Sequence, residues 1–256
     1  MSNNLQTSKT LNKFEESLSN EKYTKGREIE RTSKQYLRGE IPNAKSDTEK
    51  ALDVGCGSGL NAAQIKAKGY NVYGVDLSPV AIEKFNQNGF NGTVADLGNK
   101  LPFEDNYFDI VFASEVIEHL VDTKFFLDEL YRVLKPGGRI FLSTPNSAFW
   151  AFRLLTIIGK TPTDFQHPGH LRFFTPSSLR TWMNNSKFSV ESTKARHMYF
   201  IFGEKFAAPF AKILDFIPFL KKELRFKTKK YYWHLSSFAK NASGFWADTI
   251  IITGKK

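Results

Sequence analysis

A glycine-rich turn within residues 52–59 constrains the fold of this chain more than any other feature of its sequence. The apolar run 51–54 enters the turn and predicts a short buried strand of a parallel sheet. Residues 60–68 then predict a helix that ends at Gly69. Glycine lacks a Cβ atom, so the backbone can bend sharply here and a ligand can lie directly on it. A strand, a glycine turn and a helix in this order predict a nucleotide cradle.

A second short apolar run, residues 72–75, ends in Asp76, which lies 17 positions after Gly59. In a strand–helix–strand unit, this spacing places the carboxylate at the carboxyl edge of the second strand, beside the glycine turn. A carboxylate there can accept hydrogen bonds from both hydroxyls of a ribose. The glycines follow a G-x-G-x-G pattern without the extra residue of the dinucleotide fingerprint, which favours a nucleoside ligand that has no pyrophosphate.

Three further motifs follow in order, at 95–97, 101–111 and 132–139. Together with the glycine turn and Asp76, they resemble the ordered motifs of class I S-adenosylmethionine-dependent methyltransferases. The resemblance covers residues 51 to about 146. It implies an α/β fold with a seven-stranded, mostly parallel Rossmann-like sheet and helices on both faces. It also implies S-adenosyl-L-methionine as the cofactor.

The resemblance also implies which residues bind each part of the cofactor. Asp53 and the glycines of the turn would hold the methionine part, Asp76 the ribose, and Asp96 with Leu97 the adenine. Cys56 is expected to be a small side chain in a crowded turn rather than a nucleophile, because no activating histidine lies near it in the sequence. The complete expected set of cofactor-binding residues is Asp53, Gly55, Cys56, Gly57, Gly59, Asp76, Leu77, Asp96, Leu97 and Ser114.

The rest of the core alternates strands with helices, which predicts a parallel sheet covered on both faces. Strands are expected at 51–54, 71–75, 92–95, 109–113, 138–143, 188–196 and 247–253. Helices are expected at 79–88 and 176–185, where a serine or threonine cap precedes a proline. About 50 residues separate the last two strands, too many for a plain hairpin loop, so we interpret residues 197–246 as an insertion.

Length and composition suit one large domain: the chain has 256 residues, of which 41% are hydrophobic. Its single cysteine excludes a disulfide framework and fits a reducing compartment. The polar N-terminus and the absence of a long uncharged stretch predict a cytoplasmic protein without a spanning helix. We divide the chain into an N-terminal helical cover and linker, a cofactor-binding core, the insertion and a final core strand, at residues 1–50, 51–196, 197–246 and 247–256.

The net charge of +10 is unevenly distributed, because residues 51–147 carry −4 and residues 148–256 carry +12. The insertion contains apolar residues at helical spacing over 206–217, then six basic residues among 221–230, then an aromatic cluster. This combination suits contact with an anionic membrane surface through residues 205–233. A helical cap with a solvated basic face is an equally good interpretation. RNA fits less well, because the chain has no RNA-binding motif.

The run 114–120, Ser-Glu-Val-Ile-Glu-His-Leu, supplies the candidate catalytic residues. If it is helical, Glu115, Glu118 and His119 lie at positions i, i+3 and i+4 on one face. Such a group could hold a divalent metal, or His119 could act as a general base. The run resembles the E-x-x-E-H stretch of ubiquinone-biosynthesis O-methyltransferases, which implies a metal and a catechol acceptor. The alternative is that Glu118 and His119 shape the pocket floor by hydrogen bonding.

The segment after the fifth expected strand supplies candidate substrate-binding residues. Residues 149–158 predict a nearly all-apolar helix that is too short to span a bilayer, and that forms core, a pocket lid or an interfacial face. His167, His170 and Arg172 resemble the substrate-side loop of quinone and sugar methyltransferases. A metal role for these two histidines is not indicated, because no cysteine or acid completes the set at a usual spacing.

These observations predict an enzyme that transfers a methyl group from S-adenosylmethionine to a small-molecule or lipid-linked acceptor. The expected acceptor atom is an oxygen, on a quinone precursor or a glycan. Methyl transfer is an in-line displacement that mainly requires alignment, and a general base helps when the acceptor is a hydroxyl. The alternatives are an RNA or protein methyltransferase and a cofactor-binding scaffold without turnover.

Overall fold

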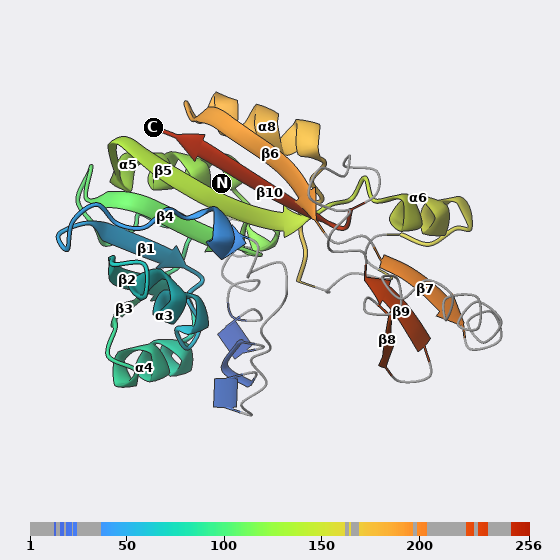
Figure 1. Ribbon diagram of the computed structural model, residues 1–256, viewed down its shortest axis with the longest axis horizontal. Helices are drawn as coiled ribbons and strands as arrows, with labels where there is room; N and C mark the ends of the chain where they lie inside the picture. The colour runs from blue at the N-terminus through green and yellow to red at the C-terminus, as the bar shows by residue number, and fades with distance from the viewer. Residues whose placement is uncertain are drawn as a thin grey trace.

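The structure, a computed structural model, has a seven-stranded sheet at its centre, in the order β3-β2-β1-β4-β5-β10-β6 (Figure 1). The residues that it describes are 13, 16–17, 19–21, 23–24, 37–161, 164, 169–196, 199–203, 224–227, 230–234 and 247–256. The first five strands are parallel to their neighbours, and β10 pairs antiparallel with both β5 and β6. The sheet is therefore mixed but mostly parallel, as the sequence predicts.

The strands and helices of this core lie close to the expected ranges. The strands are β1 Lys50–Val54, β2 Asn71–Asp76, β3 Asn91–Val94, β4 Phe108–Ser114, β5 Leu134–Pro145, β6 Ser189–Arg196 and β10 Thr249–Lys255. The helices are α3 Leu60–Lys66, α4 Pro79–Gln87, the 3-10 helix η1 Ile117–His119, α5 Thr123–Val133, α6 Trp150–Ile157 and α8 Pro176–Asn185. The closing antiparallel pair expected at 188–196 and 247–253 is confirmed, with β10 placed between β5 and β6.

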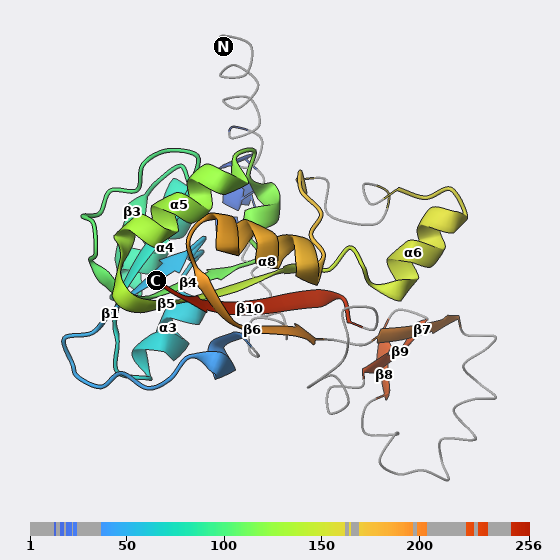
Figure 2. The ribbon, with the colours of Figure 1, turned by 90° about the horizontal axis from the view of Figure 1, so that it is seen from above.

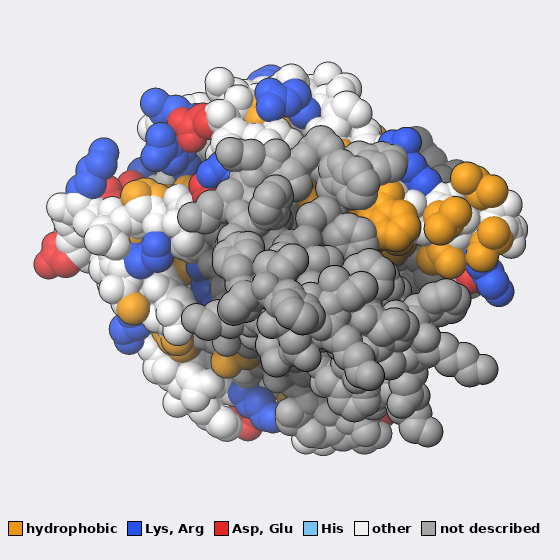
Figure 3. Space-filling view, turned by 45° about the vertical axis from the view of Figure 1, so that its right-hand side comes forward, with side chains coloured by type: hydrophobic (Ala, Val, Ile, Leu, Met, Phe, Trp, Pro, Cys, Tyr) orange, Lys and Arg blue, Asp and Glu red, His pale blue; other side chains and the backbone are white. Residues whose placement is uncertain are grey.

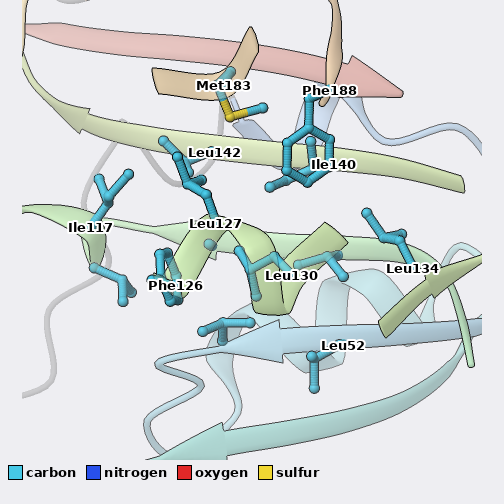
Figure 4. Close-up of a cluster of buried hydrophobic side chains, with 14 of the residues drawn as sticks. Leu52, Ile117, Phe126, Leu127, Leu130, Leu134, Ile140, Leu142, Met183 and Phe188 are labelled. Atoms are coloured by element: carbon cyan, nitrogen blue, oxygen red, sulfur yellow. The ribbon is translucent and has the colours of Figure 1, made fainter. Parts of the chain in front are cut away.

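Helices α5 and α8 cover one face of the sheet, and α3 covers the other (Figure 2). Leu127 and Leu130 of α5 and Met183 of α8 are fully buried in the first core, together with Leu52 of β1 (Figure 4). Successive side chains of a strand point to opposite faces, so Ala51 belongs to the second core instead.

The second core lies under α3 and α4. It buries Ala62 and Ile65 of α3 and Ile82 and Phe85 of α4 against the same strands. Both helices begin at the carboxyl edge of the sheet, directly after β1 and β2. The two cores therefore fix the positions of the glycine turn and of the start of α4 from opposite sides of the strands.

The described N-terminal residues are helical at 13, 16–17, 19–21, 23–24 and 37–40. Ser78, the N-cap of α4, donates its hydroxyl proton to the side-chain oxygen of Asn20, and Lys84 donates to the carbonyl of Tyr23. These contacts attach the segment to α4, beside the end of β2. That the segment covers a substrate pocket stays a prediction.

The described part of the insertion is a three-stranded antiparallel sheet in the order β7-β9-β8. Its strands are β7 Tyr199–Gly203, β8 Leu224–Lys227 and β9 Lys230–His234. The basic run 221–230 thus contributes to two strands, because Leu-Arg-Phe-Lys alternates with the period of a strand. The apolar residues at helical spacing, 206–217, lie outside the described residues. Among the described helices, none is long and apolar enough to cross a membrane.

Candidate cofactor and catalytic site

The candidate site lies where the strand order changes direction, at the carboxyl ends of β1 and β4. β1 pairs in parallel with both strands of the break, β2 on one side and β4 on the other. Connections leave β1 and β4 toward opposite sides of the sheet, and ligands bind in the crevice that this opens. Val116, after β4, lies directly over Gly55: a Cβ atom added to Gly55 would stand 2.7 Å from Val116 Cγ2. Val116 lies between Glu115 and Glu118 in the sequence, and nothing in that pattern predicts its contact with Gly55.

The glycine turn requires backbone conformations that other residues rarely adopt. Gly55, Gly57 and Gly59 have φ angles of +67°, +56° and +101°. The amides of Gly55 and Cys56 both donate to the carbonyl of Val75, at 2.8 and 3.1 Å, which ties the turn to the end of β2. The side chain of Cys56 is buried in this turn. The turn therefore presents its backbone closely to the crevice, as a nucleotide cradle requires.

Asp76 joins the glycine turn to the start of α4. Its Oδ2 atom accepts a hydrogen bond from the Gly57 amide at 3.0 Å, and Oδ1 accepts one from the Ser78 amide at 2.9 Å. The residue is 7% exposed. The carboxylate thus lies beside the glycine turn, where the spacing placed it, and its binding of a ribose stays a prediction. Leu77, the next residue, is half-buried.

Asp96 lies at the end of the third strand region and organises its own loop. Its Oδ1 accepts from the Gly98 amide and its Oδ2 from the Asn99 side chain, both at 2.8 Å. Leu97 beside it is buried. The structure therefore gives Asp96 a positioning contact with its loop, and its proposed contact with adenine stays a prediction.

Asp53 and Ser114 lie inside the sheet at the ends of β1 and β4. Asp53 is fully buried, and Ser114 is 4% exposed. The hydroxyl of Ser114 lies 2.9 Å from that of Ser143 on β5, so the two strands are linked at the edge of the site. Burial of a carboxylate is costly unless it has partners, so Asp53 marks this edge as a polar site rather than ordinary core.

The run 114–120 is not the α-helix on which the predicted grouping of its side chains depended. Glu115 has a left-handed backbone, with φ +58°, and its amide donates to the Ser143 carbonyl at 3.0 Å. Its Oε1 atom accepts from the Ser143 hydroxyl at 3.1 Å. Only the short helix η1 follows. The expectation that Glu115, Glu118 and His119 share one helical face is therefore wrong, because Glu115 remains hydrogen-bonded to β5.

Glu118 is a buried carboxyl group at the centre of the site. Its side chain is 1% exposed, and its Oε2 accepts a hydrogen bond from the Thr144 hydroxyl at 2.9 Å. Its Oε1 lies 4.0 Å from His170 Nε2. The pKa of Glu118 is raised to about 8. Burial is the largest cause, the nearby charge of Glu115 also raises it, and His119 lowers it by a smaller amount. At neutral pH the group therefore holds its proton far more strongly than an ordinary glutamate.

Two histidines complete this group. His119 Nδ1 lies 3.1 Å from the Gly169 carbonyl oxygen, which can only accept, so this hydrogen bond requires the proton on Nδ1. The rings of His119 and His170 meet edge to face, with centroids 4.9 Å apart. Glu118, His119 and His170 place one ligand atom each within 4.8 Å of one another. The structure thus brings His170 into the group where the sequence placed Glu115.

The loop that carries His170 is fixed by the backbone of η1. The amides of Leu171 and Arg172 both donate to the carbonyl of Glu118, at 2.8 and 3.0 Å. Arg172 also donates from Nη2 to the carbonyl of Val121 at 2.7 Å. Arg172 therefore holds the loop in place, and its expected contact with substrate stays a prediction. His167, also expected to bind substrate, lies outside the described residues.

The raised pKa of Glu118 predicts how stability depends on pH. Between its unfolded pKa of about 4.5 and its folded value of about 8, the native state binds more protons, so stability falls as pH rises through this window. The cost is about 1.4 kcal/mol for each pH unit. Glu118→Gln cannot ionise, so its stability relative to wild type should improve between pH 5 and pH 8 by a few kcal/mol. Urea unfolding at both pH values measures this, with the exposed Glu83→Gln as control.

Helix α6 leaves the site after β5 and is not part of either core. None of its residues is buried, and Leu154, Ile157 and Ile158 are 52%, 81% and 66% exposed. Hydrophobic side chains gather at this end of the molecule in Figure 3. Phe149, just before the helix, is buried, but the exposure of its last residues excludes a core role for the helix itself and leaves a pocket lid or an interfacial face.

Comparisons with known proteins find a methyltransferase domain in this chain. A family model described as a methyltransferase domain matches residues 52–142. Ubiquinone biosynthesis O-methyltransferases are similar in sequence: that of Pseudomonas savastanoi pv. phaseolicola is 28% identical over 160 residues, and that of Xanthomonas oryzae pv. oryzae 30% over 153. Each match covers 56% of this chain. They cover 66% and 63% of those relatives, which is less than two thirds of their length.

Solved structures share the fold at lower identity. A putative methyltransferase from Bacillus halodurans is 19% identical, with a TM-score of 0.59 over 88% of this chain and 99% of that one. An S-adenosylmethionine-dependent methyltransferase from Archaeoglobus fulgidus is 21% identical, with a TM-score of 0.58 over 88% of this chain and 93% of that one. Residues 52–142 of this chain thus match the methyltransferase domain model, and the chain shares the fold of these S-adenosylmethionine-dependent methyltransferases.

Proposed function

We propose that the protein methylates a hydroxyl group of a small-molecule or lipid-linked acceptor, with S-adenosylmethionine as the methyl donor. The observation that carries the proposal is the arrangement along one sheet edge. The glycine turn follows β1 and Asp76 ends β2; Glu118 and His119 follow β4 and are joined by His170 from the loop before α8. A nucleoside held by the first set would place its reactive end at the crevice beside the second. The named activity of the ubiquinone-biosynthesis relatives supports oxygen as the acceptor atom.

Bound S-adenosylmethionine would supply an electrophilic methyl carbon on a sulfonium that is already a good leaving group. The residues of this chain then have two tasks. The turn and Asp76 fix the donor, so that the acceptor oxygen can approach in line. His119 is the proposed general base, because the Gly169 carbonyl accepts its Nδ1 proton and so fixes the orientation of the ring. Glu118 is the proposed second proton-holding group, and Glu115 a polar group at its side.

The three grouped side chains also suit a divalent metal. Two imidazoles and one carboxylate offer ligand atoms within 4.8 Å, and small movements would bring them to a common ion. Thr144 and the Gly169 carbonyl already hold the outer atoms of Glu118 and His119, as the partners of metal ligands do. A metal held there by Glu118, His119 and His170 would make an acceptor hydroxyl more acidic. We retain it as a second way in which the same group activates the acceptor.

An acceptor with an apolar part suits the rim of this site. Val121, Leu171 and Phe173 are 46%, 36% and 37% exposed on the segments that flank Glu118 and His170. Exposed apolar side chains beside a polar reaction centre favour an amphiphilic substrate, such as a quinone precursor or a lipid-linked glycan. We place the enzyme in the cytoplasm, at the inner face of a membrane that it contacts through residues 205–233.

The proposal is tested with S-adenosylmethionine that is labelled in its methyl group. The purified protein is incubated with the label and a lysate of the source cells, and organic, small aqueous and macromolecular fractions are separated. Label is expected in the organic phase or on a small molecule, bound through oxygen. His119→Ala should remove at least 90% of this incorporation while cofactor binding persists, since a general base contributes about a hundredfold or more. The exposed Lys124→Ala is the control.

Two results would contradict the proposal. Label confined to RNA or protein would mean that the acceptor is a macromolecule. Cofactor binding without incorporation into any fraction would mean a binding scaffold.

A further inference from the structure

Two sequence motifs, at 101–111 and 132–139, have no part in the proposed function, and one side chain joins them. Arg132, in the last turn of α5, makes five hydrogen bonds. Two of them run from Nε and Nη2 to the carboxylate of Glu129, both at 2.8 Å, in the bidentate geometry of a strong ion pair. A guanidinium has five N–H donors, so Arg132 uses all of them to hold other residues of the protein.

The ion pair holds the backbone of the segment before β4. Leu101 donates its amide to Glu129 Oε2 at 2.9 Å, and its carbonyl accepts from Arg132 Nη2 at 3.1 Å. The carbonyl of Phe103 accepts from Arg132 Nη1 at 2.8 Å. Arg132 and Glu129, whose side chains are 17% and 11% exposed, thus form a clamp on this backbone. Charge-assisted hydrogen bonds away from water leave such a backbone little freedom to move.

The clamp fixes one end of the turn that carries Asp96. At the start of this turn, the Ala95 amide donates to the Asp76 carbonyl at 3.0 Å, which ties the turn to the end of β2. At its end, Leu101 is buried in the first core and held by the clamp. The turn 96–101 is therefore anchored to β2 on one side and to α5 on the other.

This turn lies where the base of a bound nucleoside is expected. The strand order β3-β2-β1 places the turn after β3 on one side of Asp76 and the glycine turn after β1 on the other. A nucleoside whose ribose binds to Asp76 therefore has one end at the glycine turn and the other toward Asp96. Since the glycine turn is expected to hold the methionine part, the base lies on the side of Asp96.

We propose that Arg132 and Glu129 are positioning residues for recognition of the cofactor's base. The clamp holds the turn 96–101 in the shape in which Asp96 can accept a hydrogen bond from the amino group of adenine. A site built to hydrogen-bond such a group rejects an analogue that lacks it, and this rejection requires that the acceptor is held in place. Selectivity for adenine therefore depends on the clamp. The inference rests on the proposed binding of S-adenosylmethionine, and not on the identity of the methyl acceptor.

The test compares S-adenosylhomocysteine with S-inosylhomocysteine, in which a carbonyl replaces the amino group of the base. Isothermal titration of the full-length protein measures both affinities and needs no methyl acceptor. The wild-type protein should bind the adenosine compound more tightly by about tenfold or more. The ratio of the two affinities is the informative quantity, because a general loss of stability weakens the binding of both compounds alike.

Arg132→Lys should lower this ratio by about fivefold or more, and the affinity for S-adenosylhomocysteine by about tenfold. Lysine keeps a cation beside Glu129, but its three donors lie at one point and cannot reproduce the planar fork. The carbonyls of Leu101 and Phe103 therefore lose their common donor, and the turn loosens. If Arg132→Lys does not fold, Glu129→Gln serves instead: it keeps an acceptor for the Leu101 amide, weakens the hold on Arg132 and should lower the ratio in the same direction.

Two control variants separate the clamp from ion pairing in general. Asp105→Asn removes the ion pair between Arg132 and Asp105, whose side chain is 66% exposed, and leaves the backbone hydrogen bonds in place. Arg139→Lys changes another guanidinium that binds both oxygens of a glutamate, Glu191, at 3.1 Å. Both variants should leave the affinity for S-adenosylhomocysteine and the ratio within about twofold of wild type.

The possible failures can be told apart. A folded Arg132→Lys protein with an unchanged ratio would mean that the clamp only supports the fold, and would overturn the proposal. Asp96→Ala should lower the ratio as well. If it does so and Arg132→Lys does not, the clamp alone is wrong. If neither variant lowers the ratio, or if the wild type does not distinguish the two compounds, the base is not bound by Asp96 and the inference fails with that assignment. A protein that binds S-adenosylhomocysteine selectively but transfers no methyl group would remove the proposed function alone.

Discussion

Asp76→Ala should abolish measurable binding of S-adenosylmethionine. The carboxylate is proposed to accept hydrogen bonds from both ribose hydroxyls, and hydrogen bonds to a charged group contribute about 1.5–3 kcal/mol each. Their joint loss lowers affinity by about a hundredfold or more. The same change also leaves the amides of Gly57 and Ser78 without their acceptor, which loosens the turn itself. Isothermal titration with S-adenosylmethionine measures the affinity, and urea unfolding measures the accompanying loss of stability.

Asp109→Ala is the matched control for this prediction. Asp109 also accepts a backbone hydrogen bond, from the Lys50 amide at 2.8 Å, and forms an ion pair with Lys135. It lies near the start of β4, at the opposite edge of the sheet. Its loss should therefore cost stability and leave cofactor affinity within about twofold of wild type. Retained affinity in a folded Asp76→Ala protein would contradict the assignment of the ribose site.

Gly55→Ala should destabilise the protein by about 2–4 kcal/mol and prevent cofactor binding. The φ angle of +67° costs a non-glycine residue about 1–2 kcal/mol. The new methyl group would also stand 2.7 Å from Val116 Cγ2, and Val116 is a buried β-branched side chain that has little freedom to turn away. Relief of this clash must push β1 and the segment after β4 apart, at the crevice that holds the cofactor. Urea unfolding and cofactor titration measure the two effects.

Gly89→Ala separates the backbone cost from the clash. Gly89 has a similar φ angle of +79°, but a Cβ atom there would meet nothing within 4 Å. The change should cost only about 1–2 kcal/mol and leave cofactor binding intact. Val116→Ala should restore part of the stability lost in Gly55→Ala, as a coupling energy in a double-mutant cycle. A Gly55→Ala protein as stable as Gly89→Ala, with normal affinity, would contradict the packing at the switch point.

Local signals made most of the core predictable. The helices α4 and α8 lie within one residue of their expected ranges, because Ser78 and Thr175 cap them and a proline follows each cap. Strand β5 was less predictable at its start. It begins at Leu134 instead of residue 138, because Leu134 pairs with Phe108 across a register shift although proline and glycines interrupt the run. Residues of low strand propensity do not end a strand whose backbone stays paired with a neighbouring strand.

The candidate site could be located but not assembled from the sequence. Asp76 follows from spacing within one strand–helix–strand unit, whereas His170 reaches Glu118 only through hydrogen bonds from a loop some 50 residues later. The grouping of Glu115 with Glu118 and His119 held only if 114–120 was helical, and the hydrogen bond between Glu115 and Ser143 accompanies a different backbone. The contact between His170 and Glu118 joins residues too far apart in the sequence for any local pattern to predict it. In the insertion, apolar and basic residues alternate over 224–227. The basic composition of the run 221–230 did not reveal this alternation.

A crystal structure with S-adenosylhomocysteine bound is the measurement that tests the central claim most directly. The ribose hydroxyls should lie within hydrogen-bond distance of Asp76, with the adenine beside Asp96 and Leu97. The amino-acid part should lie on the Gly55–Gly59 turn, so that the sulfur faces the group of Glu118, His119 and His170. A nucleoside bound elsewhere, or turned so that its sulfur lies away from that group, would contradict the account.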